Sequence, residues 1–333
     1  MPAPWDLVTL VRASLSLLSL FGLFKAALPA QTSIDDIHIA PRAASVRTSE
    51  AANGLHVIRT GAQLVLVPVS VTDSMQRFVI GLNQENFQVF EGKKPQTIQN
   101  FSREDMPASI GIILDMSGSM KDKIERLREA VTQFCEAANP RDEFFMIVFS
   151  DQPRLAIDFT SSSDDIEHEL VFTQAQGRTS LLDAIHMGLR KMEEAKYGKR
   201  ALLIVSDGGD NHSRHNEQDI RALTKESDVM IYSIGLFDRY VPTAEEMRGP
   251  ALLSEIAEPT GGRAYTLDNP NEMPALARRI GLELRTQYVL AYRPQTLTED
   301  GKWHKIKVKL MLPRKFPFLR ARARTGYYAS AER

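Results

Sequence analysis

The chain has little cysteine and almost no net charge. Cys135 is the single cysteine among 333 residues, so no disulfide can form within the chain. It falls on the apolar face of an expected helix, which favours a buried structural thiol over a reactive one. The formal net charge is −1 and the pI is about 6.7. The overall charge therefore directs the chain toward neither nucleic acid nor membrane surfaces.

Long apolar runs are also scarce, and the stretch 13–24 is too short to span a bilayer comfortably. Arg12 precedes this stretch and Ala26-Ala27-Leu28-Pro29-Ala30 follows it, which fits a secretory signal peptide over residues 1–30 although Leu28 is large for its place before the cut. An uncleaved signal anchor and an amphipathic helix are the alternatives. The segment contains no cysteine that could carry a lipid. We expect a periplasmic or extracellular protein in which residues 31–54 form a polar linker.

Oxygen-bearing side chains follow two apolar runs that are typical of buried strands. Asp115, Ser117 and Ser119 come directly after the run 110–114, and Asp207 comes directly after the run 201–206. A third loop carries Gly177 and Thr179 before a helical stretch. Open α/β sheets bind ligands at the carboxyl ends of their strands, so these loops are expected to meet. Their hydroxyl and carboxylate oxygens suit Mg²⁺, Mn²⁺ or Ca²⁺ rather than zinc or copper.

The pattern of Asp-x-Ser-x-Ser, a later Gly-x-Thr and a strand-borne Asp-Gly resembles the metal-ion-dependent adhesion site of von Willebrand factor type A domains. The resemblance covers roughly residues 107–287. It implies that Ser117, Ser119 and Thr179 bind a metal ion directly, and that Asp115 and Asp207 act largely through water. All five positions are filled in this sequence.

The flanking segments are similar to those of a group of secreted bacterial von Willebrand A-related proteins that is abundant in acidobacteria. The resemblance rests on three segments, which are Leu82–Lys93, Leu284–Tyr292 and Thr325–Tyr328. It gives an expected fold and metal site, but it does not name a binding partner.

The fold class expected from the pattern is α/β. Continuous apolar runs alternate with helical spacing over residues 105–287, which predicts a doubly wound, mostly parallel sheet. The flanks 55–104 and 288–333 read as short antiparallel strands, each too small to be stable alone. We expect the two flanks to pair into one small β-sandwich with the α/β domain inserted between them. Two separate small sheets are the alternative.

The expected function is binding and not catalysis. Three hydroxyls and two carboxylates held through water leave one position of an octahedral metal ion open. With few direct anionic ligands the metal ion stays electrophilic, which favours capture of an Asp or Glu carboxylate from a protein partner. A metal-dependent hydrolase is one alternative, with Asp210, His212 and His215 as candidate bases. A phosphoaspartate hydrolase would place a second Asp two residues after Asp115, and this sequence lacks it. Nucleophilic phosphate chemistry is therefore not expected.

A structural envelope protein that acts through its β domain is the other alternative. Two basic stripes alternate with apolar residues near the C-terminus, and they are Lys305, Lys307 and Lys309, and Arg320, Arg322 and Arg324. If these strands paired, six cations could face an anionic envelope component. A solvated face with acidic neighbours from elsewhere is the simpler interpretation.

Overall fold

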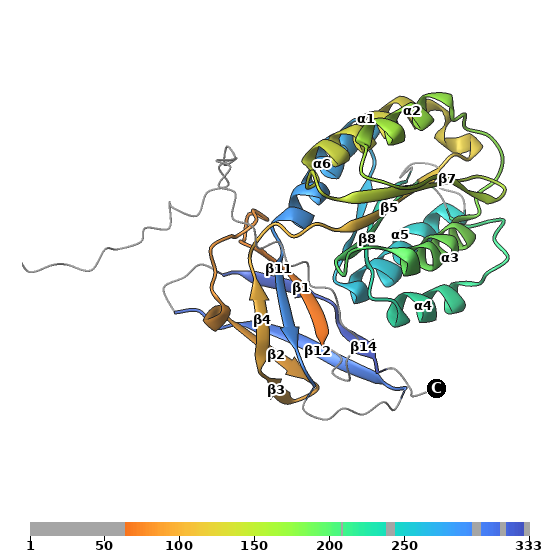
Figure 1. Ribbon diagram of the computed structural model, residues 1–333. Coiled ribbons are helices and arrows are strands. Elements are labelled where there is room, and N and C mark those ends of the chain that lie inside the picture. The colour runs from red at the N-terminus through yellow and green to blue at the C-terminus, as the bar shows by residue number, and fades with distance from the viewer. Residues whose placement is uncertain (1–63, 208, 238–243, 295–300, 314–317, 330–333) are drawn as a thin grey trace, which may run out of the picture. The chain divides into compact units, whose positions relative to one another are not determined.

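The computed structural model of the chain describes residues 64–207, 209–237, 244–294, 301–313 and 318–329. Its largest sheet has six strands in the order β10-β9-β8-β5-β6-β7 (Figure 1). Neighbouring strands are parallel except β7, which pairs antiparallel with β6. The strands are β5 (Ser109–Asp115), β6 (Glu143–Phe149), β7 (Pro153–Thr160), β8 (Arg200–Ser206), β9 (Met230–Leu236) and β10 (Arg263–Leu267).

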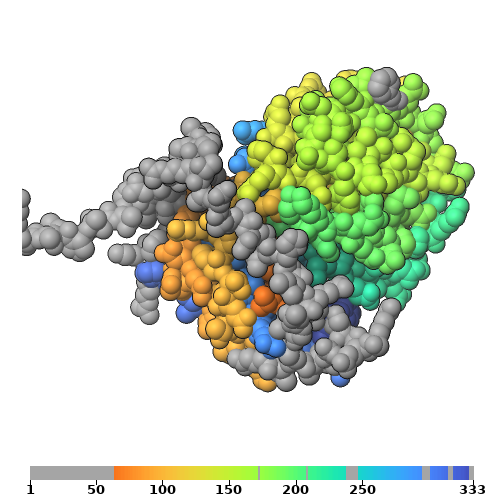
Figure 2. Space-filling view, viewed as in Figure 1, coloured from red at the N-terminus to blue at the C-terminus, as the bar shows by residue number. Residues whose placement is uncertain are grey.

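Helices cover both faces of this sheet (Figure 1). One face carries α1 (Ile124–Ala137), α2 (Ser163–Phe172) and α6 (Met273–Arg285). The other face carries α3 (Leu181–Lys191), α4 (Glu217–Glu226) and α5 (Ala244–Ala257). Because both faces are covered, every residue of β5 and β9 is buried, which explains the continuous apolar runs in the sequence. In Figure 2 the side chains of the yellow and green segments form a continuous surface over this region.

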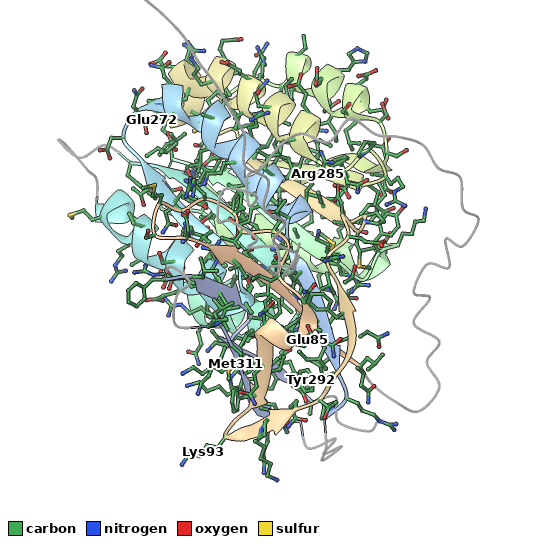
Figure 3. All side chains as sticks on the ribbon, turned by 90° about the vertical axis from the view of Figure 1, so that its left-hand side faces the viewer. Glu85, Lys93, Glu272, Arg285, Tyr292 and Met311 are labelled. Atoms are coloured by element: carbon green, nitrogen blue, oxygen red, sulfur yellow. The ribbon has the colours of Figure 1, made fainter. Side chains whose placement is uncertain are left out.

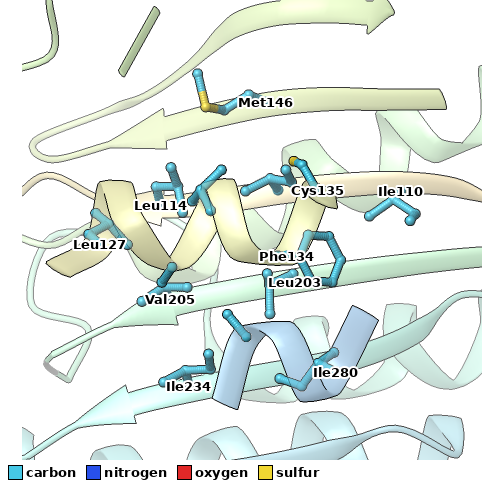
Figure 4. Packing of buried hydrophobic residues seen from close by; sticks show 14 of the residues in the cluster. Ile110, Leu114, Leu127, Phe134, Cys135, Met146, Leu203, Val205, Ile234 and Ile280 are labelled. Atoms are coloured by element: carbon cyan, nitrogen blue, oxygen red, sulfur yellow. The ribbon is translucent and has the colours of Figure 1, made fainter. Parts of the chain in front are cut away.

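The apolar stripe of α1 packs on the sheet. Leu127 and Phe134 are fully buried against strand residues that include Ile110 and Leu114, and Cys135 lies in the same cluster (Figure 4). Burial raises the pKa of the Cys135 thiol to about 12, so it stays protonated. This agrees with the expected structural role of the single cysteine.

Two further sheets enclose a separate core of aliphatic and aromatic side chains. The first has the order β13-β1-β11-β4, and the second has the order β14-β12-β2-β3. The strands of the first sheet are β1 (Val65–Thr72), β4 (Ile98–Ser102), β11 (Tyr288–Tyr292) and β13 (Arg320–Ala323). Those of the second are β2 (Phe87–Glu91), β3 (Lys94–Gln96), β12 (Trp303–Leu310) and β14 (Gly326–Tyr328).

Each of these sheets combines strands from before and after the α/β region. β1 pairs antiparallel with both β11 and β13, and β2 pairs antiparallel with β12. Figure 3 follows the chain from Glu272, before α6, through Arg285 at its end to Tyr292 at the end of β11. The expected α/β fold, with a mostly parallel sheet between antiparallel β segments that form a small sandwich, is thus confirmed.

Two details of the strand pairing depend on contacts between distant segments of the chain. The strand that pairs with β2 across the turn at Gly92 is β3, whereas β4 crosses to the other sheet and pairs with β11. The basic strands β12 and β13 do not form a ladder, because β13 pairs with β1. Arg322 and Arg324 are instead held in ion pairs with Glu283 and Asp228. The two basic stripes are therefore not paired with each other, and acidic neighbours from elsewhere in the chain hold Arg322 and Arg324, as in the simpler interpretation.

The expected signal peptide over residues 1–30 and the linker over 31–54 lie outside the described residues. Among the helices that the structure does describe, none has the length and apolar character needed to cross a bilayer.

Candidate metal site

The candidate metal site lies where the strand order of the main sheet changes direction. β5 and β8 are neighbours in the sheet. β5 ends at Asp115, and β8 ends at Ser206, directly before Asp207. This is the topological switch point at which open α/β sheets bind ligands. Both carboxylates are fully buried, with no exposed side-chain surface.

Hydrogen bonds fix the orientation of the Asp115 carboxylate. Its Oδ1 accepts from the backbone N–H of Ser117 at 2.8 Å, and its Oδ2 accepts from the hydroxyl of Ser206 at 2.5 Å. Burial, helped by the nearby charge of Asp207, raises the pKa of Asp115 to about 6. Two buried carboxylates at one site are costly unless a cation balances them, so the site is suited to a positive ion.

The two serines and Asp207 present a chain of oxygens. Ser117 Oγ lies 3.1 Å from Ser119 Oγ, and Ser119 Oγ donates to Asp207 Oδ1 at 2.8 Å. Adjacent oxygens of an octahedral Mg²⁺ site with metal–oxygen distances of about 2.1 Å are separated by about 3 Å. The observed separations therefore fit ligands on neighbouring corners of such a site.

Backbone contacts join the loop that carries Thr179 to the loop that carries the two serines. The N–H of Gly118 donates to the carbonyl of Gly177 at 3.0 Å, and the N–H of Gln176 donates to the carbonyl of Met116 at 2.8 Å. Gly177 has φ +87, and a Cβ there would lie 2.8 Å from Asp151 Oδ2, so a glycine is required. Within the described residues the Thr179 hydroxyl makes no hydrogen bond, which leaves its oxygen available.

A third loop holds the backbone of Thr179 from the other side. The side chain of Asn211 accepts from the Thr179 N–H at 3.0 Å, and the N–H groups of Asn211 and His212 both donate to the Thr179 carbonyl at 3.1 Å. The structure thus brings Asp115, Ser117, Ser119 and Asp207 into one hydrogen-bonded group, and it ties Thr179 to the same loops.

Two of the three candidate bases of a hydrolase, Asp210 and His215, have contacts of their own. Asp210 accepts from the N–H of Leu182 at 2.8 Å, at the N-terminus of α3, where a negative charge is favourable. It also accepts from the hydroxyl and the N–H of Ser213. His215 Nδ1 lies 2.6 Å from Asp183 Oδ1, and its ring stacks on His186 with centroids 4.0 Å apart.

The described residues hold no group of three or more His, Cys, Asp or Glu side chains that could bind a metal ion. The candidate oxygen site differs from such groups, because hydroxyls would supply most of its ligands.

Three residues near the site were not identified from the sequence pattern, and they are Ser206, Asn211 and Lys123. Ser206 is the last residue of a buried strand and precedes Asp207, a position that could have identified it. Lys123 Nζ lies 2.5 Å from Asp207 Oδ2, although the two residues are 84 positions apart. No local pattern could have predicted that contact.

Comparisons with known proteins agree with the fold of this region. Residues 110–209 match the sequence profile of the von Willebrand factor type A domain. The human inter-alpha-trypsin inhibitor heavy chain H4 is 27% identical over 145 residues, which cover 39% of this chain and 15% of the inhibitor chain. An uncharacterized protein of Borreliella burgdorferi is 23% identical over 186 residues, covering 49% of this chain and 54% of its own length.

The solved structures that resemble this chain include a von Willebrand factor type A protein from Catenulispora acidiphila. It is 12% identical, with a TM-score of 0.48, and the match covers 82% of this chain and 64% of that one. The chain thus spans a small part of the human relative and about half of the bacterial one. From the profile match and the observed fold, we conclude that the chain contains a von Willebrand factor type A domain, a class of domain that typically mediates protein–protein interactions.

Proposed function

We propose that this protein binds a protein partner through a divalent cation held at the carboxyl ends of β5 and β8. The observation that supports this most is the group of oxygens formed by Ser117, Ser119 and Asp207, with separations of 3.1 and 2.8 Å. These separations suit a small hard cation, and two fully buried carboxylates supply the compensating charge. Mg²⁺ is the expected ion, with Mn²⁺ or Ca²⁺ as substitutes.

In this proposal Ser117, Ser119 and Thr179 bind the cation directly, and Asp115 and Asp207 act through water. The bound cation would supply an electrophilic position that prefers a carboxylate oxygen. The direct ligands would be neutral hydroxyls and the two carboxylates would act through water, so an Asp or Glu side chain of a partner would add the direct anionic ligand that the site lacks. The protein would then serve adhesion or scaffolding.

Binding is favoured over metal-dependent hydrolysis because two of the three candidate bases have structural contacts. Asp210 accepts hydrogen bonds at the start of α3, and His215 is paired with Asp183. A general base has to be free to take a proton from an activated water. We therefore propose that the protein is not an enzyme.

The test compares the wild type with Thr179→Ala and with Thr266→Ala, which changes an exposed threonine on β10. Calorimetry with Mn²⁺ should show one site per chain in the wild type and in Thr266→Ala, and at least tenfold weaker binding in Thr179→Ala. A peptide with one Asp should then bind the Mn²⁺-loaded wild type more tightly than the same peptide with Asn. Equal Mn²⁺ affinity in all three proteins would overturn the proposal.

A second candidate function is supported by a specific observation on the β-sandwich. Lys305, Lys307 and Lys309 are exposed on one side of β12, and none has an ion-pair partner among the described residues. Lys307 borders a hollow of about 870 Å³ whose lining includes five other cations and two acids. The cations are Arg221, Lys225, Arg263, Arg322 and Arg324, and the acids are Glu255 and Glu258.

This surface could bind an anionic envelope component without any metal. Salt and chelator distinguish the two candidates, because exposed charge pairs are screened by salt whereas a short metal–oxygen contact is screened much less. Binding to a sulfated polysaccharide that survives EDTA and fails in about 0.5 M salt would favour the basic surface. In that case Lys305→Glu and Lys307→Glu together should remove the binding, and Asp207→Ala should not.

The proposed location is outside the cytoplasm, in the periplasm or the extracellular space. The support for it is the sequence pattern of residues 1–30 alone. N-terminal sequencing of the native protein tests it, with a start near Gln31 expected. An intact Met1 on a protein recovered from the cytosol would overturn it.

A further inference from the structure

Lys123 forms an ion pair with one of the carboxylates of the candidate metal site. Its Nζ lies 2.5 Å from Asp207 Oδ2, while Asp207 Oδ1 accepts from Ser119 Oγ at 2.8 Å. Asp207 is fully buried, and the side chain of Lys123 is 26% exposed. One oxygen of this carboxylate therefore faces the serines, and the other already has a cation from the chain itself.

The lysine belongs to the same loop as the serines. The 3₁₀ turn Gly118–Lys123 begins directly after Ser117 and ends at Lys123, where α1 starts. Met120 is fully buried within this turn and fixes it to the core. The backbone of Lys123 is thus held in place by the turn, whereas its long side chain is flexible and partly exposed to solvent.

The ion pair offsets part of the negative charge that is buried at this site. Asp115 and Asp207 are both fully buried, at the carboxyl ends of adjacent strands. Two such carboxylates without a nearby cation would strongly destabilise the folded chain. Lys123 supplies one positive charge, so the folded site does not depend entirely on a metal ion.

We propose that Lys123 is a tethered counter-cation that stabilises the metal-free site and competes with the divalent ion for Asp207. This inference rests on the proposed function of the site. A divalent ion close to Asp207 repels the ammonium group, and the partly exposed side chain can then move toward solvent. The lysine lowers the affinity for the metal, and it makes occupancy depend on the surrounding metal concentration.

The opposite role is physically distinct. If Lys123 stayed on Oδ2 while the metal ion used Oδ1, it would orient the carboxylate for the metal. Its removal would then weaken metal binding instead of strengthening it. The sign of the change in affinity therefore decides between competition and positioning.

The experiment uses the full chain with Lys123→Met, and with Lys121→Met as a matched control. Lys121 lies in the same turn, is exposed and has no ion-pair partner among the described residues. We expect Lys123→Met to bind Mn²⁺ about tenfold more tightly than the wild type by calorimetry, and Lys121→Met to match the wild type. Lys123→Arg, which keeps the charge, should stay within about threefold of the wild type.

Thermal unfolding gives an independent measurement. In EDTA, Lys123→Met should melt about 4–8 °C below the wild type, because Asp207 is left buried without its cation. At saturating Mg²⁺ this difference should fall below about 2 °C, since the metal ion replaces the lost charge. If Lys123→Met folds only when Mg²⁺ is present, this also supports the proposal, because the metal ion then supplies the charge that the variant lacks.

Several outcomes would overturn the role of Lys123. Unchanged or weaker Mn²⁺ affinity in Lys123→Met would do so, as would a loss of thermal stability that is equal with and without Mg²⁺. Absence of metal binding in the wild type and in all three variants would instead overturn the metal site itself, and this inference with it. If the wild type and Lys121→Met bind Mn²⁺ but Lys123→Met shows no gain in affinity, the role of Lys123 is wrong while the metal site itself stands.

Discussion

The hydroxyl of Ser206, the last residue of β8, donates a hydrogen bond of 2.5 Å to Oδ2 of Asp115, the last residue of β5. Both side chains are fully buried. The bond joins the ends of the two strands that flank the candidate metal site. It also keeps the Asp115 carboxylate in one orientation, so Ser206 is expected to matter for metal binding without being a ligand.

Replacement of Ser206 by alanine should therefore weaken both the fold and the metal site. We expect a loss of about 1–3 kcal/mol in the free energy of unfolding, because a buried carboxylate oxygen loses its donor. Mn²⁺ affinity should fall several-fold. Urea unfolding and calorimetry measure the two effects.

Ser233→Ala is the matched control for this change. Ser233 lies on the adjacent strand β9 and is equally buried, but its hydroxyl makes no hydrogen bond within the described residues. Its replacement removes no hydrogen bond among these residues, so the free energy of unfolding should not fall. Equal effects of the two substitutions would show that the Ser206–Asp115 bond has no special importance.

Metal binding should weaken as the pH falls below about 6. The pKa of Asp115 is raised to about 6, first by burial and then by the charge of Asp207. Between about pH 4 and pH 6 the folded, metal-free chain binds more protons at this group than the unfolded chain, so its metal-free stability falls as the pH rises through this window. A metal ion requires the deprotonated carboxylate, so protons and metal compete.

Mn²⁺ titrations at pH 7.5 and pH 5.0 test this competition. We expect affinity at pH 5.0 to be lower by about tenfold, since one pH unit below the pKa leaves about a tenth of the carboxylate ionised. Asp115→Asn should bind weakly at both pH values and lose most of the difference. An affinity that is constant across this range in the wild type would contradict the prediction.

Asp210→Asn should act as a change in stability and not as the loss of a base. The carboxylate accepts from Leu182 at the start of α3 and from Ser213. Removal of its charge and of an acceptor should cost about 1–2 kcal/mol in the free energy of unfolding. Metal affinity should fall only a few-fold, through the neighbouring Asn211 contact with Thr179. Urea unfolding and Mn²⁺ calorimetry provide the two measurements.

Asp164→Asn provides the comparison, because Asp164 is an exposed acid in the first turn of α2 without a partner among the described residues. It should change stability by a few tenths of a kcal/mol. A metal-dependent hydrolytic turnover that disappears in Asp210→Asn while stability is unchanged would instead favour the hydrolase alternative.

The sequence predicts which loops meet at the edge of the main sheet better than it predicts the strand pairing of the two smaller sheets. Asp115 and Asp207 each end an apolar run, and such runs mark buried parallel strands whose ends meet at one edge. The contact between Lys123 and Asp207 depends on how the turn Gly118–Lys123 is oriented, which no local pattern specifies. For the same reason, the crossing of β4 to the other sheet could not be read from its residues.

The helix α5 illustrates a different limit. Gly249 and Pro250 stand inside it, and both normally interrupt a helix. Its residues Leu252, Leu253 and Ile256 are buried against the sheet, so tertiary packing compensates for the unfavourable local sequence. Local propensity therefore points away from a helix that burial stabilises.

We propose that residues 105–287 fold as a unit and that residues 55–104 do not fold without residues 288–333. The second part follows from β1, since its two neighbours β11 and β13 both come from the C-terminal segment. Deletion of 288–333 would uncover the buried Val67 and Val69. Limited proteolysis of the shortened chain should remove residues before 105 and leave 105–287 intact. Protection of the N-terminal strands in the shortened chain would contradict this.

A buried ion pair joins α6 to β13, and its disruption should be costly. Arg322 donates to Oε1 of Glu283, which also accepts from the hydroxyls of Ser70 at 2.8 Å and Tyr232 at 3.0 Å. The side chain of Glu283 is only 1% exposed. Arg322→Met leaves this carboxylate without a cation, so we expect a loss on the order of 3 kcal/mol in the free energy of unfolding.

Arg320→Met is the control, because Arg320 is exposed on the same strand and has no partner among the described residues. It should change stability by less than about 0.5 kcal/mol. Combining Arg322→Met with Glu283→Gln should recover at least about 1 kcal/mol relative to the sum of the single changes, since the buried charge is then absent as well. Urea unfolding of the four variants measures this coupling, and strictly additive losses would show that the two residues do not stabilise each other.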